Sequence, residues 1–141
     1  MGTDQIMRQI RRYESRIESL QKEIRELEQD NEELELLAGK YRNLQSSFEA
    51  HQSERKNALS VLEHASNMNS VSGYCRGMHS LLNGSEFSGA YNGISESISK
   101  IRKKQRQAEE EISICRSQIN AYSTEINQLE CAYQKAVQAE A

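Results

Sequence analysis

The stretch that decides the fold is residues 6–41, IMRQIRRYESRIESLQKEIRELEQDNEELELLAGKY. Apolar residues recur in it at alternating spacings of four and three, which is the heptad repeat of a coiled coil. Isoleucine fills several first (a) positions of the repeat and leucine most fourth (d) positions. Asn31 is the one polar a residue, which predicts that it fixes the register. The predicted seam consists of Ile6, Ile10, Tyr13, Ile17, Leu20, Ile24, Leu27, Asn31, Leu34, Ala38 and Tyr41.

Beyond Leu34 the apolar residues shift around the helix. This shift predicts that the apolar stripe rotates by part of a turn and that the helix changes its partner there. The shifted stripe consists of Leu37, Tyr41, Leu44, Phe48 and His51.

The same repeat returns in the C-terminal part of the chain and holds there for about seven heptads. Helices of roughly 60 and 50 residues would be about 90 and 75 Å long at 1.5 Å per residue. The second predicted seam consists of Phe87, Tyr91, Ile94, Ile98, Ile101, Gln105, Ala108, Ile112, Cys115, Ile119, Tyr122, Ile126, Leu129, Tyr133 and Ala136.

Between the two repeats, residues 66–93 hold five of the seven glycines and many Ser and Asn residues. Apolar residues at helical spacing within this segment predict a short helix of about three turns. Gly84 is expected to end that helix as part of an Asn-Gly stop. Ser85, followed by Glu86, is expected to cap the start of the last helix.

These patterns predict an all-α fold, a long antiparallel helical hairpin that forms a coiled-coil rod with a short helix at the bend. Residues 1–141 would form a single domain. Its first helix would span about 3–65, the bend with its short helix 66–85, and the last helix about 86–138. A parallel homodimer is the competing use of the same heptads, although it would leave the glycine-rich segment without a role.

The composition agrees with long helices that share a narrow apolar seam, and it excludes several classes of protein. None of the 141 residues is proline, and 36% are hydrophobic against 28% charged. A net charge of -3 gives no general attraction to nucleic acid or to an anionic membrane. No apolar run reaches the roughly 18 residues of a membrane span, and the start lacks the apolar core of a Sec signal peptide. We therefore expect a cytoplasmic protein.

No group of residues has the spacing of a catalytic, cofactor or metal site, so we expect no enzymatic activity and no cofactor. His51, His64 and His79 are far apart in the sequence, and no phosphate-binding glycine motif occurs. The basic run at residues 100–106 is followed, after Gln107 and Ala108, by three glutamates, which favours a solvated helix face. The cysteines are odd in number and widely spaced, so we expect them to pack as small apolar residues in a reducing environment.

Some apolar residues exceed what a two-helix seam can bury. Either the short helix at the bend covers them by internal packing, or they form a partner-binding surface. They lie beside the first seam, near the bend and on the outside of the last helix. The predicted partner-binding residues are Leu36, Leu37, Leu44, Phe48, Met78, Leu81, Leu82, Phe87 and Ile114.

The whole chain resembles the YwqH-like family, small helical proteins encoded beside LXG polymorphic toxins in Firmicutes with a type VII secretion system. The resemblance rests on the long N-terminal coiled coil, the Ser/Gly-rich middle and the final isoleucine and leucine heptads. The residues that carry it in the middle are Tyr74, Gly77, Met78, Leu81-Leu82-Asn83-Gly84-Ser85 and Ala90.

The resemblance implies a targeting factor or chaperone that binds the helical N-terminal LXG domain of a cognate toxin and supports its export. A second small helical protein, WXG100-like, would join the complex. The chain lacks the Trp-x-Gly turn and the aromatic-xxx-acid export signal of secreted members of the wider superfamily; Tyr133, for example, is followed at that offset by Val137. Co-export and retention in the cytoplasm therefore both remain open. The alternative function is a structural coiled-coil module that dimerises or spaces other domains.

Overall fold

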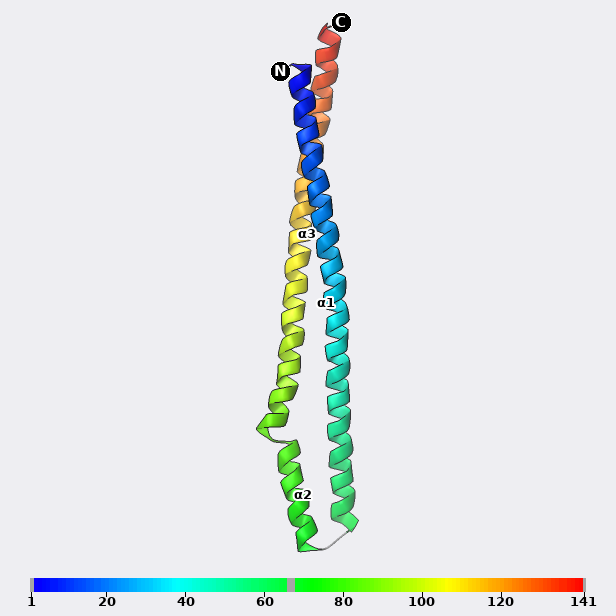
Figure 1. Ribbon diagram of the computed structural model, residues 1–141, viewed down its shortest axis with the longest axis vertical. Coiled ribbons are helices and arrows are strands. Elements are labelled where there is room, and N and C mark those ends of the chain that lie inside the picture. Colours follow the sequence, from blue (N-terminus) through cyan, green and yellow to red (C-terminus); the bar gives the residue numbers. More distant parts are fainter. Residues whose placement is uncertain (1, 66–67, 141) are drawn as a thin grey trace. The chain divides into compact units, whose positions relative to one another are not determined.

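The computed structural model describes residues 2–65 and 68–140, which form three helices and no strand (Figure 1). The helices are α1 (Thr3–Ala65), α2 (Asn69–Leu82) and α3 (Ser85–Glu140). The predicted all-α helical hairpin with a short helix between two long ones is confirmed. Ser66, where the predicted bend begins, lies outside the described residues.

Contacts divide the chain into two compact units that share the long helices. Unit 1 combines Met1–Glu33 with Gln105–Ala141, and unit 2 is the continuous segment Leu34–Lys104. Each unit therefore contains its own part of the seam between α1 and α3.

In unit 1, α1 and α3 run antiparallel. Arg16 donates a hydrogen bond to the Tyr122 hydroxyl, and Asn31 donates one to the carbonyl of Gln105, so rising numbers on α1 meet falling numbers on α3. Every predicted seam residue of this unit is buried or half-buried, as the heptad repeat requires. The most deeply buried side chains are Ile6, Ile10, Ala108, Ile112 and Cys115.

The seam of unit 2 keeps the heptad register of residues 6–41, and the predicted rotation of the stripe is wrong. Two glutamines fill the a positions seven and fourteen residues after Ala38. Gln45 donates a hydrogen bond to Ser95 Oγ (2.8 Å), and Gln52 donates one to the carbonyl of Leu82 (2.9 Å). Because these amides find partners, the register persists through two polar positions and reaches buried Leu59.

Helix α2 packs on the last turns of α1 through a small apolar cluster. Cys75 and Leu82 are 0% and 4% exposed and meet Leu59, which is 7% exposed, while Val71 and Met78 pack against them. The hydrogen bond from Gln52 reaches the last residue of α2 and fixes the end of this helix on α1.

The junction between α2 and α3 is the predicted Asn83–Gly84 stop. The Asn83 and Gly84 amides donate to the carbonyls of His79 and Leu81 (3.0 and 3.2 Å). Among the described residues no glycine has a positive φ, so the reason for glycine is steric: a Cβ at Gly84 would lie 3.0 Å from the Ser80 carbonyl oxygen.

Ser85 is the first residue of α3 rather than its cap, which corrects the prediction. The carbonyl of the preceding residue, Gly84, already accepts the hydrogen bond of the Ser88 amide, so the helical pattern begins one residue earlier than expected.

Candidate functional site

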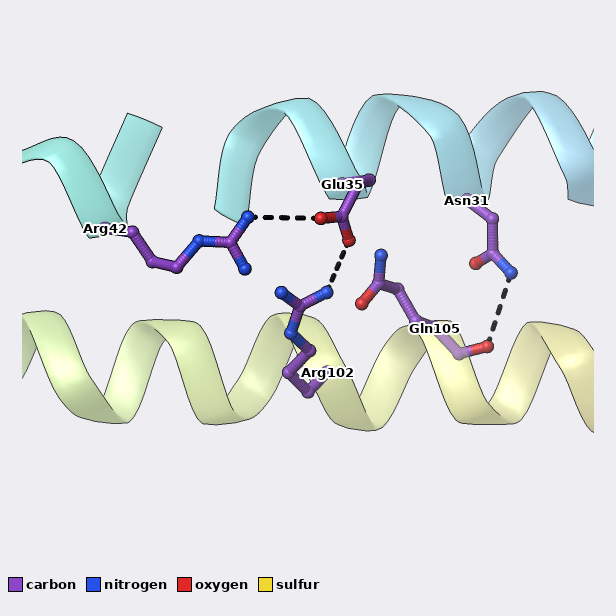
Figure 2. Close-up of polar contacts among 5 residues, drawn as sticks. All are labelled: Asn31, Glu35, Arg42, Arg102 and Gln105. Carbon is purple, nitrogen blue, oxygen red and sulfur yellow. Dashed lines mark hydrogen bonds and ion pairs between the residues drawn. The ribbon is translucent and has the colours of Figure 1, made fainter. Parts of the chain in front are cut away.

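In unit 2, the two sides of the α1 seam differ in chemistry. One side carries the residues directly after the d positions, called e. These are polar, and Glu35, Glu49 and Glu63 each contact a residue of α2 or α3. Glu35 lies between Arg42 of its own helix and Arg102 of α3 (Figure 2). Glu49 accepts a hydrogen bond from the Tyr91 hydroxyl, which is the main cause of a raised pKa at Tyr91. This side therefore carries polar residues, most of which contact another residue of the chain.

The other side of the seam, just before the a positions, is open and apolar except at His51. These g positions hold Leu37, Leu44, His51 and Ala58, each seven residues from the next. Leu37 is 41% exposed and Leu44 52% exposed. We call the row formed by these four residues the g side.

The g side leads into a groove between the end of α1 and α2, with a volume of about 330 Å³. Leu62 on α1 and Tyr74 on α2 form its exposed edges, and the apolar cluster under α2 forms its floor. Leu81, seven residues after Tyr74 on the same side of α2, is 68% exposed. The residues that line this α1–α2 groove are Arg55, Ala58, Leu59, Leu62, Tyr74, Met78 and Leu82.

A second groove of about 260 Å³ adjoins the first and shares Arg55 with it. Its wall is the stacked pair Phe48 and Phe87, whose ring centroids lie 4.3 Å apart. Stacking at this distance is a favourable internal contact. The residues that line this phenylalanine groove are Phe48, His51, Gln52, Arg55 and Phe87.

Arg55 is the charged residue common to both grooves. It occupies a d position, seven residues after Phe48 and seven before Leu62, where the repeat expects an apolar residue. It is exposed, and within residues 2–65 and 68–140 it has no ion pair or hydrogen bond through its guanidinium. A cation at the junction of two grooves marks a point where a ligand's negative charge would be stabilised.

The predicted partner-binding residues fall into two groups in the structure. Those that are exposed are Leu36, Leu37, Leu44, Leu81 and Ile114. The other four, Phe48, Met78, Leu82 and Phe87, pack internally, which is the alternative to partner binding for apolar residues near the bend. Leu82 belongs to the cluster under α2 with Met78 packed against it, and Phe48 and Phe87 are half-buried against each other.

The exposed residues do not all share one surface. Leu36 and Ile114 are 70% and 57% exposed and lie on the outer faces of their helices, away from the seam, as does Val61 at 69%. Single exposed apolar residues of this kind are common on protein surfaces. Leu37 and Leu44 instead belong to the g side, and Leu81 lies seven residues after the groove residue Tyr74 on α2.

Seven residues of the site are absent from the predicted set: His51, Gln52, Arg55, Ala58, Leu59, Leu62 and Tyr74. The signal was present in the repeat. When the heptad repeat is extended from the a position at Asn31, the g positions from Leu37 onward are apolar except His51. The e positions over the same stretch are polar. The predicted rotation of the stripe concealed this difference.

Asn31 occupies the seam of unit 1 as predicted, facing Gln105 of α3 (Figure 2). Its Nδ2 donates a long hydrogen bond of 3.4 Å to the Gln105 carbonyl, and its buried Oδ1 has no hydrogen-bond partner in the described part of the chain. An amide that is only partly satisfied costs stability, as expected if Asn31 has the register-fixing role predicted for it.

The remaining chemistry-bearing groups do not assemble into a site. No cluster of three or more His, Cys, Asp or Glu side chains that could hold a metal ion occurs in residues 2–65 and 68–140. Cys75 and Cys115 are buried, and burial is the main cause of a raised pKa at both thiols; Cys131 is exposed. His79 lies 3.7 Å from Glu63 and His51 lies 3.9 Å from Glu54.

None of the helices in the described part of the chain is both long and apolar enough to cross a bilayer.

A scan against models of protein families, a search of curated proteins and a search of solved structures each find no match to this chain. The functional conclusion therefore depends on the groove, the g side and the residues that line them.

Proposed function

We propose that the chain is a non-enzymatic helical adaptor that binds a helix of a partner protein along the g side and the α1–α2 groove. The observation that carries this proposal is the difference between the two sides of one seam in unit 2. The e side is polar and mostly paired within the chain, whereas the g side exposes leucines and reaches the apolar groove at Ala58. An open apolar surface of this kind, bordered by polar residues, is typical of a protein-binding site.

The spacing of the exposed residues favours a helical partner. Leu37 and Leu44 are separated by seven residues, as are Tyr74 and Leu81. Seven residues of helix rise about 10.5 Å, which is also the repeat of apolar anchors on an amphipathic helix laid alongside.

The partner that we propose is the helical N-terminal LXG domain of a type VII-secreted antibacterial toxin, in line with the family resemblance. The adaptor would cover the apolar stripe of that domain and keep it competent for export. A second, WXG100-like helical protein would complete the complex.

The proposal is tested by co-expressing the chain with the N-terminal domain of an LXG toxin encoded beside it. We expect the two proteins to co-purify, and we expect the double variant Leu62→Asp/Tyr74→Asp to reduce the yield of complex at least about tenfold, since two anchors lose their apolar contacts.

The matched control is Val61→Asp/Leu36→Asp, which places the same charges on the outer face of α1. This variant should retain the complex. Recovery of two unassociated wild-type proteins would exclude the proposed partner, and equal loss in both double variants would exclude the groove as the binding site. Circular dichroism of each variant checks that its helices are intact.

A further inference from the structure

We infer that the helix that binds in the α1–α2 groove is acidic and places a carboxylate against Arg55, between its apolar anchors. This inference rests on the proposed function, because it specifies the chemistry of the partner helix. It follows from the charges that line the two adjoining grooves.

The linings of the two grooves contain a cation and no carboxylate. Arg55 is the one charged residue that lines the α1–α2 groove, and the phenylalanine groove adds His51, which lies 3.9 Å from Glu54 outside the lining. The chain as a whole has 21 acidic and 18 basic residues, so the absence of acids from these linings does not reflect the composition. The local field around Arg55 therefore favours negative charge.

The position of Arg55 makes a partner's carboxylate necessary for tight binding. A helix covering Leu62 and Tyr74 would also cover Arg55, since all three line one groove. A cation that loses water without gaining a counter-charge destabilises a complex, whereas an Arg–carboxylate pair forms two directed hydrogen bonds. Glu35, Arg42 and Glu63 on the e side have ion pairs within the chain, but no described residue pairs with Arg55.

The test uses two fluorescein-labelled helical peptides of 18 residues. Both have leucine at their a and d positions; one has glutamate and the other lysine at the e and g positions. Fluorescence anisotropy with the full chain should show the acidic peptide binding about tenfold tighter, because one charge pair is gained in one case and one repulsion in the other. Equal affinity for the two peptides, or binding of neither, would overturn the inference.

Arg55→Glu should reverse the preference, so that the lysine peptide becomes the tighter ligand. The matched control is Arg76→Glu, which makes the same charge change at an exposed residue of α2 that lines neither groove. It should leave the ratio unchanged. An effect of Arg76→Glu as large as that of Arg55→Glu would show that general charge, rather than the groove, determines the preference, and would overturn the inference.

Two further outcomes separate this inference from the proposed function. If the toxin domain binds wild-type chain and Arg55→Glu equally well, the inference fails while the adaptor function stands. If the acidic peptide binds and the toxin domain does not, the inference stands and the proposed partner fails. A concentration-dependent dimer in sedimentation equilibrium that Arg55→Glu dissociates would identify a second copy of the chain as the occupant, and would overturn the inference.

Discussion

Asn31 places a single amide in the apolar seam of unit 1, with its Oδ1 buried and unpaired in the described structure. The hydrogen bond from its Nδ2 is near the long limit for such contacts. A polar residue at an a position is expected to favour one register of the paired helices over others. Its incomplete hydrogen bonding lowers the stability of the folded chain at the same time.

Asn31→Leu should therefore raise the free energy of unfolding by about 1 to 2 kcal/mol, because an incompletely paired polar group is replaced by an apolar one. Urea unfolding followed by circular dichroism measures the change. Glu33→Leu, at an exposed position of the same helix, is the control and should shift stability by less than about 0.5 kcal/mol. A loss of stability in Asn31→Leu would mean that the long hydrogen bond outweighs the unpaired oxygen.

The three cysteines should react at different rates with a thiol reagent. Cys131 is exposed and should be labelled at once, whereas Cys75 and Cys115 are buried and should react only on unfolding. Mass spectrometry of the labelled chain distinguishes the sites. Rapid labelling of Cys75 in the native protein would show that α2 leaves α1 readily.

The same two buried thiols make stability depend on alkaline pH. Burial raises the pKa of both in the folded state, and Glu63 and Glu23 raise it further. Their contribution is therefore complete below the ordinary thiol pKa of about 8.5 and is lost as the pH rises above it, because the unfolded chain ionises first. Urea unfolding at a series of pH values should show a smaller alkaline decline in Cys75→Ala/Cys115→Ala than in Cys131→Ala.

At the scale of the element, α2 is held by few contacts. Its attachment to α1 consists of the cluster of Leu59, Cys75 and Leu82 and of the hydrogen bond from Gln52. A 14-residue helix is only marginally stable by itself in water, so α2 depends on these contacts for its structure.

Leu82→Ala should detach α2 while the helices of unit 1 remain folded. Removing a buried leucine side chain costs about 2 to 5 kcal/mol, which exceeds what so small a cluster can lose. Hydrogen exchange measured by mass spectrometry should show at least a tenfold loss of protection in residues 69–82. Leu81→Ala is the matched control, because its side chain is 68% exposed, and protection should not change there. Equal effects of both variants would contradict the packing described for α2.

The two seams could be predicted from sequence because isoleucine, leucine and tyrosine mark them at regular spacing. The part of the seam beyond Ala38 could not be predicted from apolar residues alone, because Gln45 and Gln52 occupy it through hydrogen bonds to groups distant in the sequence. The α1–α2 groove was missed for a related reason. It is formed where Leu62 and Tyr74 of different helices meet, and no local spacing connects them.

At the scale of the whole molecule, the antiparallel seams predict a chain that satisfies its heptads within itself. In unit 1 the rings of Tyr13 and Tyr122 lie 5.4 Å apart, although 109 residues separate them. A chain of this kind should not need a second copy to bury its seam.

Tyr13→Cys/Tyr122→Cys, made in a Cys131→Ser background, should form a cross-link within one chain when treated with a short bis-maleimide. The product should migrate on a denaturing gel as a single chain of 16.1 kDa. In the control Tyr13→Cys/Tyr133→Cys the second site lies about 16 Å further along α3, so the short reagent should not bridge it. A product containing two chains in the first variant would support the parallel dimer instead.

The break at Asn83–Gly84 reconciles two helical repeats that are out of phase. The residues of α2 that face α1 are Val71, Cys75, Met78 and Leu82, at spacings of four, three and four. If the same spacing continued beyond Leu82, Ser85 would be the next residue to face α1. Instead Phe87, two residues further on, stacks on Phe48 of α1. If Asn83 and Gly84 were removed, Phe87 would continue the spacing of the α2 residues that face α1. The two-residue break therefore lets α2 and α3 both turn their apolar residues toward α1.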